Sequence, residues 1–355
     1  MRWGVEWVCF FVFLCWEEVW QKFQKQSSER TKEFKKWWKQ LSCGDLARVD
    51  MGYWGKVTSD YDFCERNYVV TYYVAEFFSS LSSVPILLFG LYFLKHAIVH
   101  KLGWKIMLSS IGVAIIGLGS LAFHGTLKRE GQMLDELPML WSSLFFLFTV
   151  LTLGAKAEST RWWGCVLAAC GIVSTTIYFA GGFVIFIISY IVTVASVIIC
   201  TVKYASESRH ADLKRFANLA VVLYAGGFFL LWIPEQVFCG NRLLPDRPIT
   251  GLTDLPVPLH AFFHWTSAIG PYYWLAFAAY GHLAERRSSV RVYYPRHWMS
   301  LGLALPVVHE HAPKEMWEGL GKMVKGAEKC LIVTLWQVTR FYIVRSNSYN
   351  FKSSF

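Results

Sequence analysis

Residues 162–203 read WWGCVLAACGIVSTTIYFAGGFVIFIISYIVTVASVIICTVK and are apolar almost throughout. One helix needs about 20 apolar residues to cross a bilayer, so this run is about twice too long for a single crossing. Gly181-Gly182 is the only credible turn signal inside it. The stretch therefore predicts two membrane-spanning helices joined by a short turn.

Similar apolar stretches occur along most of the chain. The seven expected spans lie near 69–94, 104–123, 136–154, 162–181, 183–203, 216–234 and 257–281. Only helices and closed barrels satisfy their backbone groups in lipid. The sequence thus predicts an all-α, polytopic membrane protein: a seven-transmembrane helix bundle without β-sheet, packed round a cavity that opens at the lumenal end.

The composition supports a membrane protein. Hydrophobic residues make up 54% of the chain and charged residues only 17%. The net charge of +10 does not indicate nucleic acid, because the basic residues fall in the tails and in short loops between apolar runs. The nine cysteines form no CxxC pair, so neither a zinc finger nor a thioredoxin motif is expected.

Loop charges predict the orientation. Basic residues are enriched on the side expected to be cytosolic: Lys95, Lys101, Lys105, Lys156, Arg161, Lys203, Arg209, Lys214, Arg215, Arg286, Arg287, Arg291 and Arg296. The opposite loops carry fewer: Lys128, Arg129, Arg242 and Arg247. The C-terminus is therefore expected in the cytosol and the start of the first span in the lumen.

Three regions follow from this pattern. Residues 1–51 form an N-terminal extension of unknown role, 52–285 the membrane domain, and 286–355 a basic cytosolic tail. The eight basic residues of 22–48 oppose a lumenal N-terminus. The short apolar run 7–16 fits part of a weak signal peptide or an interfacial segment.

Two histidine motifs end apolar segments on the lumenal side: Ser120-Leu-Ala-Phe-His124 and His260-Ala-Phe-Phe-His264. On a helix, residues four apart leave the same face. With His124 at the same depth, the three imidazoles match the ligands of a catalytic zinc that keeps one position for water. A single such histidine would fit a packing role equally well, but the set of three favours a metal.

Asp135 and Ser120 lie near these histidines in the expected topology. A carboxylate at Asp135 could act as the general base or hold a histidine ring; by itself it would be a helix N-terminal acid. Ser120 precedes His124 by one turn and could donate to an oxyanion, or be a small packing residue.

The segment Asp62-Phe-Cys-Glu65-Arg-Asn67, followed by Glu76, is rich in hard oxygen ligands that suit calcium better than zinc. The spacing is not that of an EF-hand. Taken alone, the segment fits capping and turn formation better than calcium binding.

These motifs together resemble the alkaline ceramidase family. The resemblance covers about residues 52–281: it runs through Gly52-Tyr-Trp-Gly55 and the 62–77 segment, Gly119 to Lys128, Gln132 to Met139, and the His260 motif. It implies an amidohydrolase of the endoplasmic reticulum or Golgi that cleaves ceramides or phytoceramides to a sphingoid base and a fatty acid, using water activated by zinc.

The resemblance also implies roles for individual residues. The family's zinc ligands would be His124, His260 and His264, and its catalytic pair Ser120 and Asp135. Its calcium ligands would be Asp62, Phe63 (through its carbonyl), Glu65, Asn67 and Glu76. A family disulfide would be Cys64–Cys239, which a lumenal setting permits.

The chain departs from the family at Phe63, where tryptophan is usual, and at Arg66, where an acid is usual. Two other functions fit the same architecture: a non-enzymatic lipid receptor of the progestin and adipoQ type, and a lipase that remodels GPI anchors. The expected partners are a ceramide-type substrate and membrane lipids, with no nucleic acid and no protein partner predicted.

Overall fold

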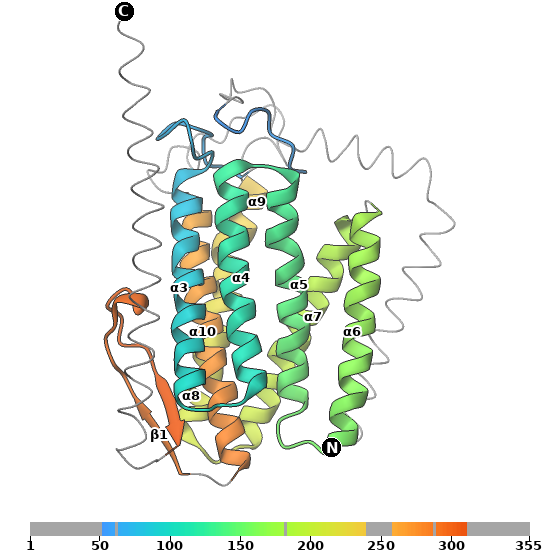
Figure 1. The fold of residues 1–355 in the computed structure, drawn as a ribbon, viewed down its shortest axis with the longest axis vertical. Helices are drawn as coiled ribbons and strands as arrows, with labels where there is room; N and C mark the ends of the chain where they lie inside the picture. The colour runs from blue at the N-terminus through green and yellow to red at the C-terminus, as the bar shows by residue number, and fades with distance from the viewer. Residues whose placement is uncertain (1–51, 61–62, 181–182, 239–257, 287–288, 311–355) are drawn as a thin grey trace, which may run out of the picture.

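Six helices pack side by side as a closed ring. The computed structural model describes residues 52–60, 63–180, 183–238, 258–286 and 289–310. The ring runs in the order α3 (Phe77–Val99), α4 (Trp104–Thr126), α5 (Arg129–Leu151), α7 (Phe183–Glu207), α8 (Ala211–Gly227) and α10 (Leu259–Glu285), and α10 closes it against α3. α6 (Ala157–Phe179) lies outside the ring, against α5 and α7 (Figure 1).

α8 continues without a break into two short elements. These are a π-helical turn, η1 (Phe228–Trp232), and the short helix α9 (Ile233–Phe238). Together they carry the chain to the end of the bundle where α3 begins and α4 ends.

Six segments of the described residues are long and apolar enough to cross a membrane, which supports a polytopic membrane protein. They are 77–99, 104–126, 129–151, 157–179, 186–207 and 211–235. The seventh expected span, 257–281, corresponds to α10, which has 27 residues but is not among the six. The count of seven spans is thus not confirmed.

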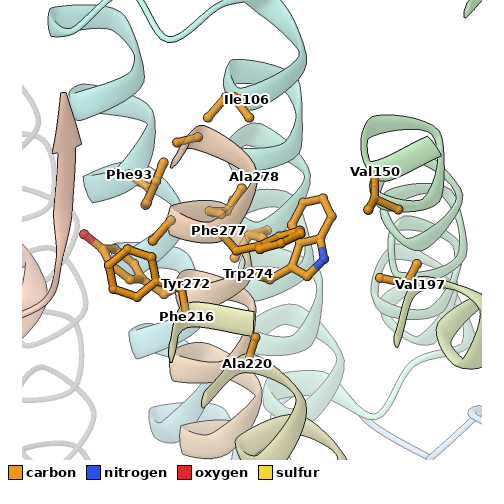
Figure 2. Close-up of a cluster of buried hydrophobic side chains, with 14 of the residues drawn as sticks. Phe93, Ile106, Val150, Val197, Phe216, Ala220, Tyr272, Trp274, Phe277 and Ala278 are labelled. Carbon is orange, nitrogen blue, oxygen red and sulfur yellow. The ribbon is translucent and has the colours of Figure 1, made fainter. Parts of the chain in front are cut away.

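The enclosed position of α10 explains its greater polarity. All residues from 272 to 281 except Tyr273 are buried. The Trp274 indole stacks on Phe146 with ring centroids 4.1 Å apart and donates to Thr201 at 3.0 Å. Figure 2 shows Tyr272, Trp274 and Phe277 of α10 inside the hydrophobic core. A helix covered by its neighbours does not need the continuous apolar surface of a helix that faces lipid.

The first helix begins later than expected. The expected span started at 69, but α3 starts at Phe77, so Glu76 precedes the helix instead of lying within it. The reason is a backbone pairing: the N–H groups of Ala75 and Glu76 donate to the carbonyls of Gly125 and His124. Residues 69–76 thereby cross over the end of α4.

The third expected span was placed too late. α5 begins at Arg129, so Asp135 lies about two turns inside the helix and not at its start. Helical residues before Asp135 include the polar Arg129, Glu130 and Gln132, which the hydropathy pattern left in a loop.

The expectation of no β-sheet was wrong. Strands β1 (Val290–Tyr293) and β2 (Val307–Glu310) form an antiparallel pair in which Val290 faces Glu310. Between them, the short 3-10 helix η2 (Trp298–Ser300) contacts α3. Met299, Leu305 and Val308 join the hydrophobic core, so residues 289–310 pack against the bundle.

A cavity of about 160 Å³ lies inside the ring, many times the space that one water needs. Its lining residues come from α3, α4, α5, α7, α8, η1 and α10, with Phe63 from the preceding segment.

The backbones of α4 and α5 meet at Gly119. A Cβ atom at this position would lie 1.9 Å from the Leu134 carbonyl oxygen, so only glycine fits. This contact places Ser120 next to Asp135 along the two helices.

We predict that Gly119→Ala will force the two helices apart. The expected loss of stability is about 1–3 kcal/mol or more, seen as a lower midpoint of thermal unfolding in detergent. Gly226→Ala is the matched control, because its added Cβ would meet nothing within 4 Å. Equal midpoints for both variants and the unmodified protein would contradict the close contact.

Candidate metal centre

The three histidines singled out from the sequence come together at one end of the cavity. His124 is in the last turn of α4, and His260 and His264 are in the first turns of α10. One ring nitrogen from each lies within 4.8 Å of the others, and all three side chains are buried. Within the described residues, no other group of this kind is found.

The Nδ1 atom of each ring faces a partner on another element. His124 Nδ1 lies 2.6 Å from Glu76 Oε2, and His264 Nδ1 donates to the Ser79 carbonyl at 3.0 Å. His260 Nδ1 lies 3.2 Å from Glu235 Oε2. Such contacts fix the orientation of the ring and leave Nε2 as the nitrogen available to a metal.

These donors fit zinc. His124 Nε2 is buried and has no hydrogen-bond partner, which is unfavourable unless something else binds it. Three neutral imidazoles with one open position are the ligand set of catalytic zinc sites. Zinc–nitrogen bonds of about 2.0–2.1 Å would place tetrahedral ligand nitrogens about 3.4 Å apart, inside the 4.8 Å within which the three lie.

Ser120 and Asp135 line the same cavity as His260 and His264. Ser120 Oγ lies 3.0 Å from Ser83 Oγ, and Ser83 donates to the Ser79 carbonyl at 2.8 Å. Asp135 is buried but is not part of the three-histidine cluster. Its role as a general base stays a prediction.

The acidic segment caps α3. Glu65 accepts from the N–H groups of Phe78 and Ser79 at 2.6 and 2.8 Å, which satisfies two orphan donors of the helix N-terminus. Burial raises the pKa of Glu65, although these two N–H groups act in the opposite direction. The capping role inferred from the sequence is therefore present.

The calcium ligands are partly gathered. Glu76 is fully buried and its Oε1 accepts from the Phe63 N–H at 3.0 Å, and Asn67 is buried nearby in the chain. Asp62 lies outside the described residues. Arg66, the unusual residue of this segment, is exposed. Calcium binding stays a prediction.

Only one of the two cysteines of the predicted disulfide is among the described residues. Cys64 is disulfide-bonded, and its Sγ lies 3.8 Å from the Glu235 carbonyl oxygen. The expected partner, Cys239, lies outside the described residues, so the pairing stays a prediction.

One site residue and one side-chain contact were missed from the sequence. The Phe63 ring packs on His260 with centroids 3.8 Å apart, whereas only its carbonyl was assigned a role. Glu235 was not singled out at all. A signal existed, because a carboxylate at the end of an apolar run is as costly there as at Asp135.

Comparison with known proteins places this centre in a family. The family model described as ceramidase matches residues 55–309. The chain belongs to the ceramidase family. The match includes β1 and β2, which the resemblance of the sequence motifs did not reach.

The ceramidase relatives span yeast, plants and animals. Alkaline ceramidase 3 of Mus musculus is 30% identical over 234 residues, covering 64% of this chain and 86% of its own. An alkaline ceramidase of Saccharomyces cerevisiae is 28% identical over 244 residues, covering 63% and 77%. The alkaline ceramidase of Arabidopsis thaliana is 30% identical over 189 residues, covering 53% and 72%.

We predict one zinc per chain in the purified protein. His124→Ala and His264→Ala should each lose most of it, because two imidazoles hold zinc poorly. His210→Ala, which changes an exposed histidine, should keep it. Elemental analysis measures all four proteins, and full zinc content in His264→Ala would contradict the ligand assignment.

Proposed function

We propose that this ceramidase-family protein hydrolyses the amide bond of ceramides or phytoceramides, releasing a sphingoid base and a free fatty acid. The observation that carries the proposal is the convergence of three buried imidazoles, Ser120 and Asp135 on one end of a largely apolar cavity. The names of the relatives agree with this substrate class.

The cavity suits a lipid chain. Its walls away from the histidines include Phe146, Val197 and Trp274. From His264 to Trp274 the helix rises about 15 Å, so the cavity follows α10 well into the bundle. A hydrocarbon tail in this space would bring the polar amide of the same lipid to the histidine end.

The reaction needs an activated water, a base and an oxyanion donor. Zinc, when bound, supplies a Lewis acid that makes water acidic enough to ionise near neutral pH. The Asp135 carboxylate accepts the water proton and passes it to the departing amine, which leaves only after protonation. The Ser120 hydroxyl donates to the oxygen that becomes negative at the amide carbon. His124, His260 and His264 hold the metal without taking part in proton transfer.

We also propose calcium beside this site. Glu76 and Glu235 each contact a zinc-ligand histidine, and Glu235 is close enough to raise the pKa of Glu65. Glu65, Glu76, Glu235 and Asp135 bring several negative charges to this end of the cavity. Zinc would offset two of these charges, and a second divalent cation would offset two more. Oxygen ligands of this kind suit calcium.

Removal of calcium should lower ceramide turnover while zinc stays bound. The calcium would hold residues 63–76 over the ends of α3 and α4, and thereby hold Glu76 against His124. A chelator selective for calcium over zinc, followed by readdition of calcium, tests this. Turnover that is indifferent to such treatment would contradict the proposal.

Loop charges support a lumenal metal centre in the endoplasmic reticulum or Golgi, with the C-terminus cytosolic. A tag placed after α10 should be accessible from the cytosol in sealed microsomes. Accessibility only from the lumen would reverse the orientation.

The two catalytic residues should differ in their effect on turnover. Asp135→Asn keeps the side-chain shape but removes the base, so ceramide hydrolysis should fall by about 10²–10⁴-fold. Ser120→Ala removes one donor and should cost about 10²–10³-fold. Zinc content must be measured in the same preparations and should be unchanged.

The unmodified protein provides the reference for substrate class. It should cleave ceramide or phytoceramide and leave a GPI lipid intact. Near-normal turnover in Asp135→Asn would eliminate the general-base role, and zinc loss in that variant would point to a structural role instead. No hydrolysis of either ceramide by zinc-loaded protein would contradict the proposed function.

A further inference from the structure

Glu235 is a buried carboxylate next to a metal-ligand candidate. It belongs to α9, is only 1% exposed, and its Oε2 lies 3.2 Å from His260 Nδ1. The contact is at ion-pair distance but bent away from a linear hydrogen bond. A carboxylate at this depth is unfavourable unless it has a specific task.

The Nδ1 contacts of His124 and His264 indicate what the task of Glu235 is. His124 is oriented by the Glu76 carboxylate and His264 by the Ser79 carbonyl, both at the start of α3. α3 gives no such contact to His260 Nδ1 within the described residues. Glu235, approaching from α9, supplies the third Nδ1 contact, which is at ion-pair distance and not a linear hydrogen bond.

The π-helical turn before α9 sets the direction of Glu235. In η1 the Ile233 N–H donates to the Phe228 carbonyl, five residues back instead of four. This turn accommodates one more residue than an α-helical turn would. Because the turn absorbs this residue, Glu235 lies where residue 234 would lie in an uninterrupted α-helix, a difference of about 100° in direction.

The continuous helix formed by α8, η1 and α9 is fixed in place just before the π-helical turn. A Cβ atom at Gly227 would lie 2.0 Å from Thr266 Oγ1, so α8 packs tightly against α10 there. Because α8 cannot rotate at Gly227, the direction of Glu235 depends on the residues of η1. π-Turns inside α-helices occur often at functional sites.

We propose that Glu235 is a positioning residue that orients His260 toward zinc, and that the π-helical turn 228–232 is the device that aims it. This inference rests on the proposed zinc centre. It assigns Glu235 no contact with substrate.

The first test is the zinc affinity of Glu235→Gln. Loss of a carboxylate that orients a ligand histidine typically costs about 10–100-fold in metal affinity, and that loss is expected here. Glu235→Asp keeps the charge on a shorter side chain and should lie between Glu235→Gln and the unmodified protein. Competition with a chromophoric zinc chelator in detergent measures all three, independently of turnover.

Glu136→Gln is the matched control. Glu136 is also a buried acid, but its oxygens accept from the Tyr178 hydroxyl at 2.5 Å and from Gln132 Nε2 at 3.1 Å, away from the histidines. Its loss should affect stability and leave zinc affinity unchanged. A general effect of removing any buried acid would lower zinc affinity in both variants.

The second test changes the length of the turn. Five residues of a π turn cover about the same rotation as four residues of an α-helix, so deletion of Leu230, which is 74% exposed, should leave Glu235 facing His260 and keep zinc affinity. Insertion of one alanine after Leu230 adds a residue that the turn does not absorb and rotates Glu235 by about 100°, so zinc affinity should fall at least as far as in Glu235→Gln. Equal zinc affinity in the deletion and insertion variants would contradict the aiming role of the turn.

The outcomes separate the two proposals. If the unmodified protein binds no zinc, the proposed function fails. If it binds zinc and Glu235→Gln binds it equally well, or changes only the response to calcium, the positioning role is wrong. Where Glu235→Gln is not recovered folded, Glu235→Asp carries the same comparison.

Discussion

The contact between the Glu76 carboxylate and His124 Nδ1 connects most of the site to the fold. Glu76 directly precedes α3 and its backbone pairs with the end of α4, so one residue joins two helices and a metal-ligand candidate. Through its other oxygen it binds the Phe63 N–H, and the Phe63 ring covers His260. These groups are buried in a low-dielectric environment, where a polar atom without a hydrogen-bond partner is unfavourable. Each contact therefore depends on the others being formed.

The ring of helices encloses this local set at one end of a largely apolar cavity. α10 brings its histidines to one end and lines the cavity with Trp274 further along. Its polar residues are tolerated because neighbouring helices cover it, which also explains why it is the least lipid-like of the long helices. The arrangement separates the polar histidine end of the cavity from its apolar walls.

The sequence predicted most of the site but less of the local backbone. The i, i+4 spacing of His260 and His264 and the loop charges were enough to bring both to His124. The start of α3 at Phe77 could not be predicted, because it depends on pairing between Ala75 and Gly125, which are remote in sequence. Glu235 was missed because its role requires the rotation introduced by η1, and helical periodicity assumes no such extra residue. The β1–β2 pair was missed because its contacts with the bundle come from the distant α10, while η2 between the strands contacts α3.

The central claim is that three imidazoles bind a single zinc, and X-ray absorption at the zinc edge of the purified protein tests it most directly. The account predicts a first shell of three imidazole nitrogens at about 2.0–2.1 Å and one oxygen at a similar distance. A sulfur shell near 2.3 Å, or a shell with oxygen ligands and no imidazole scattering, would contradict it.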